Sequence, residues 1–172
     1  MTTTATALAV VPDVGSCEEL GAPQAEAAVL GALMSTSPAH ARTVLESLTE
    51  GDWTVPHHAT VAAAVDTLLQ AGEPVDPVTV LGQLRRDGLD RAHAANRSAG
   101  VMLLDLLAAC PSASSAGYYA RIVREHTYRR RVQQSAVRLL QVAATGALPD
   151  LDELLSHEQV DLETIRRRLA TG

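Results

Sequence analysis

The stretch YYARIVREHTYRRR, Tyr118 to Arg131, lies inside the longest segment with a helical pattern, which runs from about Ala116 to Thr145. It holds five arginines and three of the four aromatic residues of the chain. At about 100° per residue, Arg124, Arg131 and Arg138 fall within roughly 40° of one another, and the aliphatic side chains lie mainly on another side. The pattern predicts one long amphipathic helix, whose apolar face needs a partner helix to bury it.

The composition of the whole chain favours an all-α fold. Apolar residues make up 47% of the 172 positions, Phe is absent, and Ala and Leu dominate. Ala and Leu are strong helix formers, whereas sheets use more β-branched and aromatic side chains. This length and this apolar content are sufficient for one compact domain with a buried core.

Local signals place further helices on both sides of the long one. A capping residue precedes proline at Ser37-Pro38 and at Asp76-Pro77, and each pair is typical of a helix start. Asp150, with Glu153 three residues later, has the spacing of a capping box and is predicted to cap the last helix. Residues 89–99 are small and polar and are predicted to form a loop. We expect a flexible tail over 1–21 and helices over about 23–34, 38–48, 57–71, 77–88, 100–110 and 151–169.

No motif for catalysis or metal binding is found in the sequence. The chain contains no lysine, so it has no phosphate-binding loop of the Walker type. Cys17 and Cys110 lack the spacing of a zinc site, and the adjacent His57 and His58 point about 100° apart on a helix. One of these histidines is expected to pack at the helix start and the other to be solvated. We expect no enzymatic activity, no cofactor and no metal.

Several acidic residues are isolated in the sequence, and the overall charge is acidic. Glu26, Asp76 and Asp105 are single carboxylates with no evident partner for acid–base chemistry. The net charge of −6 leaves no basic field over the whole protein for non-specific DNA binding. No secretory signal is evident and no apolar run approaches the roughly 20 residues that span a bilayer, so a cytoplasmic protein without membrane contact is predicted.

The arginine stripe leaves three interpretations open. It is a solvated helix face, a surface that pairs with carboxylates of a partner protein, or a contact for single-stranded DNA through arginine and tyrosine. The acidic balance of the rest of the chain counts against the third.

The order of these segments resembles the N-terminal domain of DnaB-type replicative helicases. The resemblance is carried by PQAEAAVLGALM (23–34), DWTVPHH (52–58), LLQAGEPVDPVTVLGQLRRDG (68–88), LLDLLAACPSAS (103–114) and YYARIVREHTYRRRV (118–132). It covers about residues 22–145, with His58 at the histidine of the family. The chain departs from the pattern at Ala59 (arginine in the family), Ala62 (aromatic), Leu103 (tyrosine) and Ser115 (asparagine).

The resemblance implies a small helical bundle followed by a helical hairpin, with residues 22–145 as the domain and residues 146–172 as a linker-like helix. In the family, hairpins of neighbouring subunits pair into dimers, and three dimers form a collar that docks primase and loaders. Residues 118–140 are expected in the hairpin, and residues 100–114 are expected to form its other arm or to lead into it. The RecA-like ATPase domain of the family has no counterpart in these residues, so its helicase activity is not carried over.

Together, periodicity and resemblance predict a homo-oligomeric assembly domain of the replication machinery. The predicted self-association residues are Leu103, Leu104, Leu107, Tyr119, Ile122, Val123 and Leu140, with Arg124, Arg131 and Arg138 as a polar rim that contacts a partner or DNA. One alternative is a regulator or inhibitor that forms mixed collars with a full-length helicase. Another is a nucleic-acid-binding protein that uses the stripe from Arg121 to Arg138. A fragment of a primase, whose helicase-binding domain has a related helical fold, is also conceivable.

Overall fold

The computed structural model describes residues 21–89 and 98–170, and every regular element in these two ranges is helical. The all-α prediction is therefore confirmed. The expected tail and the expected loop over 89–99 lie, apart from their edges, outside the described residues. The elements are α1 (Ala22–Leu33), α2 (Pro38–Glu46), η1 (Glu50–Asp52), α3 (Pro56–Ala71), α4 (Pro77–Arg86), α5 (Ala99–Ala108), η2 (Ala113–Ser115), α6 (Ala116–Thr145) and α7 (Leu148–Ala170).

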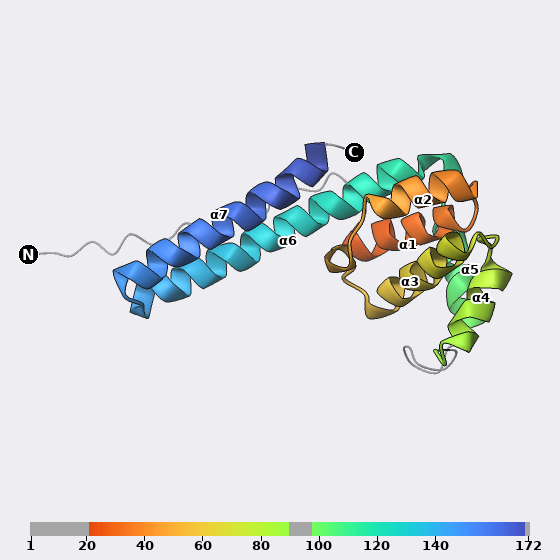
Figure 1. Cartoon of the computed structure of the whole chain (residues 1–172), viewed down its shortest axis with the longest axis horizontal. Helices are drawn as coiled ribbons and strands as arrows, with labels where there is room; N and C mark the ends of the chain where they lie inside the picture. The colour runs from red at the N-terminus through yellow and green to blue at the C-terminus, as the bar shows by residue number, and fades with distance from the viewer. Residues whose placement is uncertain (1–20, 90–97, 171–172) are drawn as a thin grey trace, which may run out of the picture.

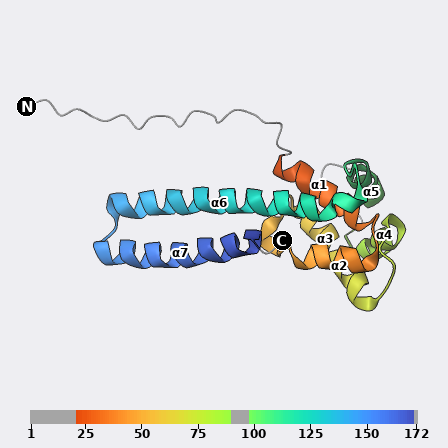
Figure 2. The same ribbon diagram turned by 90° about the horizontal axis from the view of Figure 1, so that it is seen from above.

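Helices α1 to α5 form a compact bundle, from which α6 and α7 project as a long antiparallel hairpin (Figure 1). The first half of α6 packs on α1, and its second half extends beyond the bundle beside α7 (Figure 2). The C-terminal end of α7 returns to the bundle (Figure 2), where Arg168 contacts Ser47 at the end of α2 and Asp52 in η1. Among the described residues, no single helix is long and apolar enough to cross a membrane, although the bent pair Ala99–Ala108 and Ala113–Ala144 meets that test jointly.

The helix starts follow from local chemistry. Ser37 accepts a hydrogen bond from the backbone of His40, and the Asp76 carboxylate accepts hydrogen bonds from the backbone of Val78 and Thr79. Both caps agree with the predictions. The prediction that Asp150 caps the last helix is wrong, because α7 begins at Leu148 and Asp150 lies in its first turn. Proline fits the first turn of a helix, so Pro149 moves the start towards the N-terminus.

Helix α1 lies at the centre of the bundle and contacts α2, α3, α5 and α6. Its apolar side chains, from Ala25 to Leu33, are almost all buried. At Gly31 the backbone of α5 comes so close that a Cβ atom would lie 2.3 Å from the carbonyl oxygen of Leu106. The absence of a side chain at Gly31 therefore permits the close contact of α1 with α5.

The second arm of the hairpin is α7, and of the two predicted alternatives for residues 100–114 the structure has the second, since they lead into α6 and do not form this arm. Helix α5 packs instead against α1 and α4 in the bundle. Only Gly146 and Ala147 separate α6 from α7, and such a short connection makes two helices antiparallel neighbours. The domain boundaries at 22–145 and 146–172, and the linker-like role of the last segment, stay predictions.

Candidate functional site along the arginine stripe of the hairpin

The arginine stripe of α6 faces α7. The guanidinium of Arg138 donates two hydrogen bonds to the carboxylate of Glu158, at 2.6 and 2.8 Å. Arg131 donates to Asp161 at 2.8 Å, and Arg124 donates to the backbone carbonyl of Arg168 at 2.7 Å. The seven-residue spacing on α6 thus provides three successive polar contacts along one side of the hairpin. We call this set, Arg124, Arg131 and Arg138 with Glu158, Asp161 and Arg168, the polar seam.

Glu158 is the buried acceptor of the polar seam. Besides Arg138, the hydroxyl of Ser135 donates a hydrogen bond to its carboxylate. Both hydrogen bonds favour the ionised form, and they lower the pKa of Glu158 from 4.5 to about 2. In return, the hydrogen bond with Glu158 raises the pKa of Arg138. The pair is therefore charged at neutral pH.

Acid is expected to loosen the hairpin. Because the pKa of Glu158 is lowered in the folded state, its stabilising effect is complete above about pH 4.5 and disappears as the pH falls towards about 2. Hydrogen exchange of α6 and α7 at a series of pH values through this window should show falling protection. In the Glu158→Gln variant protection should change less with pH, whereas Glu153→Gln, at an exposed position of α7, should behave as wild type. Equal pH dependence in all three proteins would contradict this role of Glu158.

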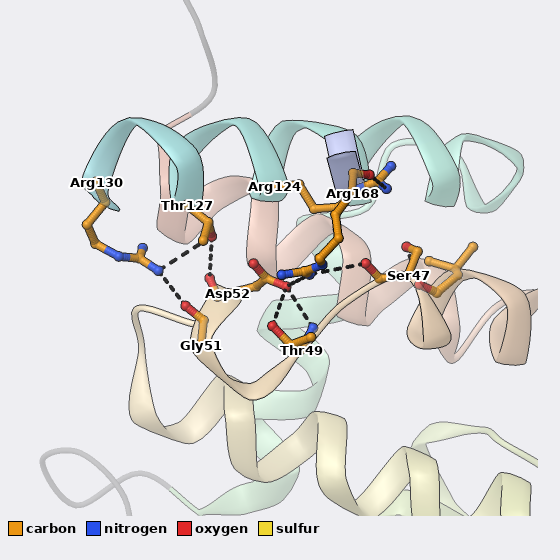
Figure 3. A network of polar contacts seen from close by, with 9 residues as sticks. Ser47, Thr49, Gly51, Asp52, Arg124, Thr127, Arg130 and Arg168 are labelled. Carbon is orange, nitrogen blue, oxygen red and sulfur yellow. Dashed lines mark hydrogen bonds and ion pairs between the residues drawn. The ribbon is translucent and has the colours of Figure 1, made fainter. Parts of the chain in front are cut away.

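At the bundle end of the hairpin, the polar seam meets the loop around η1 (Figure 3). The Oδ2 atom of buried Asp52 accepts hydrogen bonds from the backbone and hydroxyl of Thr49 and from the guanidinium of Arg168. Arg168 also donates to the carbonyl of Ser47, and Arg130 donates to the carbonyl of Gly51 at 2.6 Å. We call these contacts the Asp52 junction. They attach both arms of the hairpin to the bundle.

Arg124 is buried beside this junction. Burial lowers its pKa, the positive charge of Arg168 lowers it further, and the negative charge of Asp52 opposes both effects. Its Nε atom and the Oδ1 atom of Asp52 are buried, and neither has a hydrogen-bond partner in the described part of the chain. The sequence interpretation placed Arg124 in a polar rim, whereas the structure places its side chain inside the protein. The burial follows from the return of α7 to the bundle.

A second buried polar cluster links α1 to the start of α3. The fully buried carboxylate of Glu26 accepts hydrogen bonds from both the backbone and the hydroxyl of Thr54, from the backbone of Val55, and from Nδ1 of His58 at 2.9 Å. Burial raises the pKa of Glu26, but these hydrogen bonds outweigh it and hold the pKa below its usual value. The sequence pattern shows no second carboxylate paired with Glu26, and in the structure its partners are instead Thr54, Val55 and His58. His58 packs at the helix start, as predicted for one histidine, while His57 is half-buried.

The predicted self-association residues occupy three environments. Leu103, Tyr119 and Val123 are buried in the core of the single chain, and Leu107 and Ile122 are half-buried. Leu104 and Leu140 are exposed, at 63% and 67%, but they lie on α5 and α6 respectively. The residues therefore do not form one surface, and self-association through any of them stays a prediction. Within the described ranges, no group of three or more His, Cys, Asp or Glu side chains could hold a metal ion.

Comparison with known proteins agrees with the fold. Residues 19–125 match the family model described as DnaB-like helicase N terminal domain. The replicative DNA helicase DnaB of Mycobacterium leprae (strain TN) is 38% identical over 140 residues, which are 80% of this chain and 22% of that protein. The replicative DNA helicase DnaC of Bacillus subtilis (strain 168) is 30% identical over 150 residues, 87% of this chain and 32% of that protein. The chain thus spans less than a third of the length of these curated relatives.

Solved structures show the same relationship. The crystal structure of the N-terminal domain of DnaB helicase from Mycobacterium tuberculosis is similar at a TM-score of 0.68 and 35% sequence identity. The similarity covers 83% of this chain and 96% of that one. The matched sequence and the bundle-and-hairpin fold lead to the same assignment. This chain belongs to the DnaB-like helicase N-terminal domain family, the N-terminal domain of replicative DNA helicases.

Proposed function

We propose that this chain is a non-catalytic assembly and protein-interaction domain of the DNA replication machinery, which self-associates through the outer face of its hairpin. The observation that carries this proposal is the exposure of large apolar side chains on α6 and α7. Val137, Leu140 and Leu155 are 53%, 67% and 46% exposed. Exposed apolar residues that gather on one element are typical of protein–protein contacts.

The exposed side chains of α6 lie away from α7. Leu140 follows Arg138 by two positions, which turns it by roughly 200° around the helix. Val132, Ala136 and Leu140 are four residues apart, so they form one row on the outside of α6. On α7, Leu148, Leu155 and Leu162 repeat every seven residues and lie within about 80° of Glu158, so they flank the contact with α6. Val160, which follows Glu158 by two positions and is 68% exposed, points away from α6. A second hairpin, from another copy, is the partner that best matches these rows.

The polar seam supports the same proposal. Since Arg124, Arg131 and Arg138 form hydrogen bonds with α7, a contact of these three with single-stranded DNA would compete with the folded hairpin. Their pairing therefore counts against the nucleic-acid-binding alternative. It favours a role in which arginines hold the two arms together while the opposite face of α6 is presented to a partner.

The Leu140→Glu variant is expected to abolish self-association, because a second hairpin would have to bury the new carboxylate. The measurement is the mass in solution by light scattering behind size exclusion. Wild type should run as a dimer or a larger oligomer, and Leu140→Glu as a monomer with unchanged helix content. The matched control is Val78→Glu, the same type of change at a 79% exposed position of α4, which should leave the mass unchanged. A wild-type monomer at about 100 μM protein would contradict the proposal.

The same exposed apolar side chains of α6 and α7 would also fit an assembly of this chain with a full-length replicative helicase. A full-length replicative helicase carries its own domain of this family, and primase and loader proteins are further partners that the family resemblance implies. If wild type, but not Leu140→Glu, moves into the size-exclusion peak of the replicative helicase of the same cell, the chain is a mixed-collar component or regulator. If it self-associates and ignores the helicase, the assembly role stands and the regulatory alternative fails.

A further inference from the structure

A groove crosses the bundle where α2, α3 and the end of α4 meet. Its volume is about 850 Å³, within the range of roughly 300–1,000 Å³ that is usual for binding clefts. Leu45, Trp53, Leu69 and Leu89 contribute its apolar lining. It shares none of its lining residues with the outer face of the hairpin.

Small side chains on α3 keep this groove open. Ala59, Ala62 and Ala63 all line it, so one wall consists largely of methyl groups. A larger side chain at the exposed position Ala63 would occupy the open space of the groove.

Carboxylates surround the apolar lining. Glu46 and Glu50 lie on the α2 side, Asp66 on α3 and Asp87 at the end of α4. Arg42 is the one basic residue among the lining residues, and its guanidinium donates a hydrogen bond to the backbone carbonyl of Leu69. The groove thus combines an apolar floor with an excess of negative charge at its edge.

We infer that this groove binds an amphipathic helix of a partner protein that carries aliphatic side chains on one face and lysine or arginine beside them. Aliphatic side chains at positions i, i+3, i+4 and i+7 enter a hydrophobic groove in this mode of recognition. The basic side chains of the helix pair with the carboxylates of the rim, which speeds association and disfavours acidic competitors. Charge complementarity decides the occupant, because an acidic or neutral helix would leave the four rim carboxylates unopposed.

The only tryptophan of the chain reports on this site. Trp53 lines the groove and is half-buried, so a bound helix would cover the exposed part of its indole. Its fluorescence therefore changes on binding without any attached label. Trp53 also borders a second pocket that Thr127, Arg130 and Arg168 of the hairpin line, so variants of the groove are needed to assign the signal to it.

The test uses the full chain and a synthetic peptide of about 15 residues made of alanine, leucine and lysine, with leucine at i, i+3, i+4 and i+7. Titration should give a saturable change in Trp53 emission at micromolar concentrations, weaker at higher salt. The same peptide with glutamate in place of lysine should not bind. Absence of saturable binding up to about 1 mM lysine peptide would overturn the inference.

Two variants locate the binding. Glu50→Gln combined with Asp66→Asn should weaken it about tenfold, while the matched pair Asp152→Asn and Glu153→Gln, exposed on α7, should not. Ala63→Phe, at an exposed position of α3 that lines the groove, should block it without disturbing the core. If the groove double variant and the α7 double variant weaken peptide binding equally, the attraction is non-specific and the inference is overturned. Leu140→Glu should bind the peptide as wild type does, so failure of the hairpin proposal and failure of this one are distinguishable.

Discussion

The Glu26→Ala variant is expected to lose about 3–5 kcal/mol of unfolding free energy, a large part of the roughly 5–15 kcal/mol that holds a domain of this size. Glu26 is fully buried and accepts hydrogen bonds from Thr54, Val55 and His58. Its loss leaves the buried His58 and the part-buried backbone donors of Thr54 and Val55 without this acceptor. It also frees the chain that enters α3, since Thr54 and the N-cap residue Val55 donate their backbone N–H groups to Glu26.

The measurement is urea unfolding followed by circular dichroism at neutral pH. Glu26→Gln should lose less than Glu26→Ala, because the amide oxygen still accepts a hydrogen bond but no longer carries a charge. Gln24→Ala, two positions earlier at an exposed site of α1, is the matched control and should change stability by less than about 0.5 kcal/mol. If Glu26→Ala is as stable as Gln24→Ala, the cluster does not hold α1 to α3.

The Asp52→Ala variant is expected to detach the end of α7 from the bundle and to cost about 3 kcal/mol. The Oδ2 atom of Asp52 accepts hydrogen bonds from Thr49 and Arg168, and buried Arg124 lies beside it. Without the carboxylate, two neighbouring guanidinium groups repel each other inside the protein. Arg168, whose side chain is 28% exposed, relieves that repulsion by turning towards solvent, and the end of α7 thereby loses its attachment at Asp52.

Hydrogen exchange distinguishes a local detachment of the end of α7 from a general loss of stability. Protection should fall most in the last turns of α7 and in the loop around η1, and least in the first half of α6, which packs on α1. Asp152→Ala, at an exposed position of α7, is the control and should leave this pattern unchanged. Combining Asp52→Ala with Arg168→Ala should cost less than the sum of the two single variants, because both remove the same ion pair. Additive losses would show that Asp52 and Arg168 do not act as a pair.

The polar seam has a consequence for the proposed assembly. Polar pairs at the contact of two helices specify their register, since a shift of α7 along α6 would separate Arg138 from Glu158 and Arg131 from Asp161. A hairpin held in one register presents the apolar rows of its outer face at a fixed spacing. Two copies could then match row to row, which is the requirement for a self-complementary dimer contact.

Most helices could be predicted from the sequence because their signals are local. Ser37-Pro38 and Asp76-Pro77 combine a cap with a proline that suits the first turn, and both helices begin there. The long helix over 116–145 was predicted with the bounds that the structure has. The one incorrect start, at Asp150, came from two local signals that compete within three residues, where Pro149 prevailed over the capping box.

Local signals in the sequence did not predict which helices pack against each other. The sequence determined by itself that the chain is helical, where most helices begin, and that α6 has an arginine stripe opposite an aliphatic face. Only the tertiary structure decided that α7 rather than α5 covers that stripe, and that Glu26 meets His58, 32 positions away. The physical reason is that periodicity shows which face of a helix must be covered but carries no information on what covers it. That choice depends on the connection between Thr145 and Leu148 and on the packing of the whole bundle.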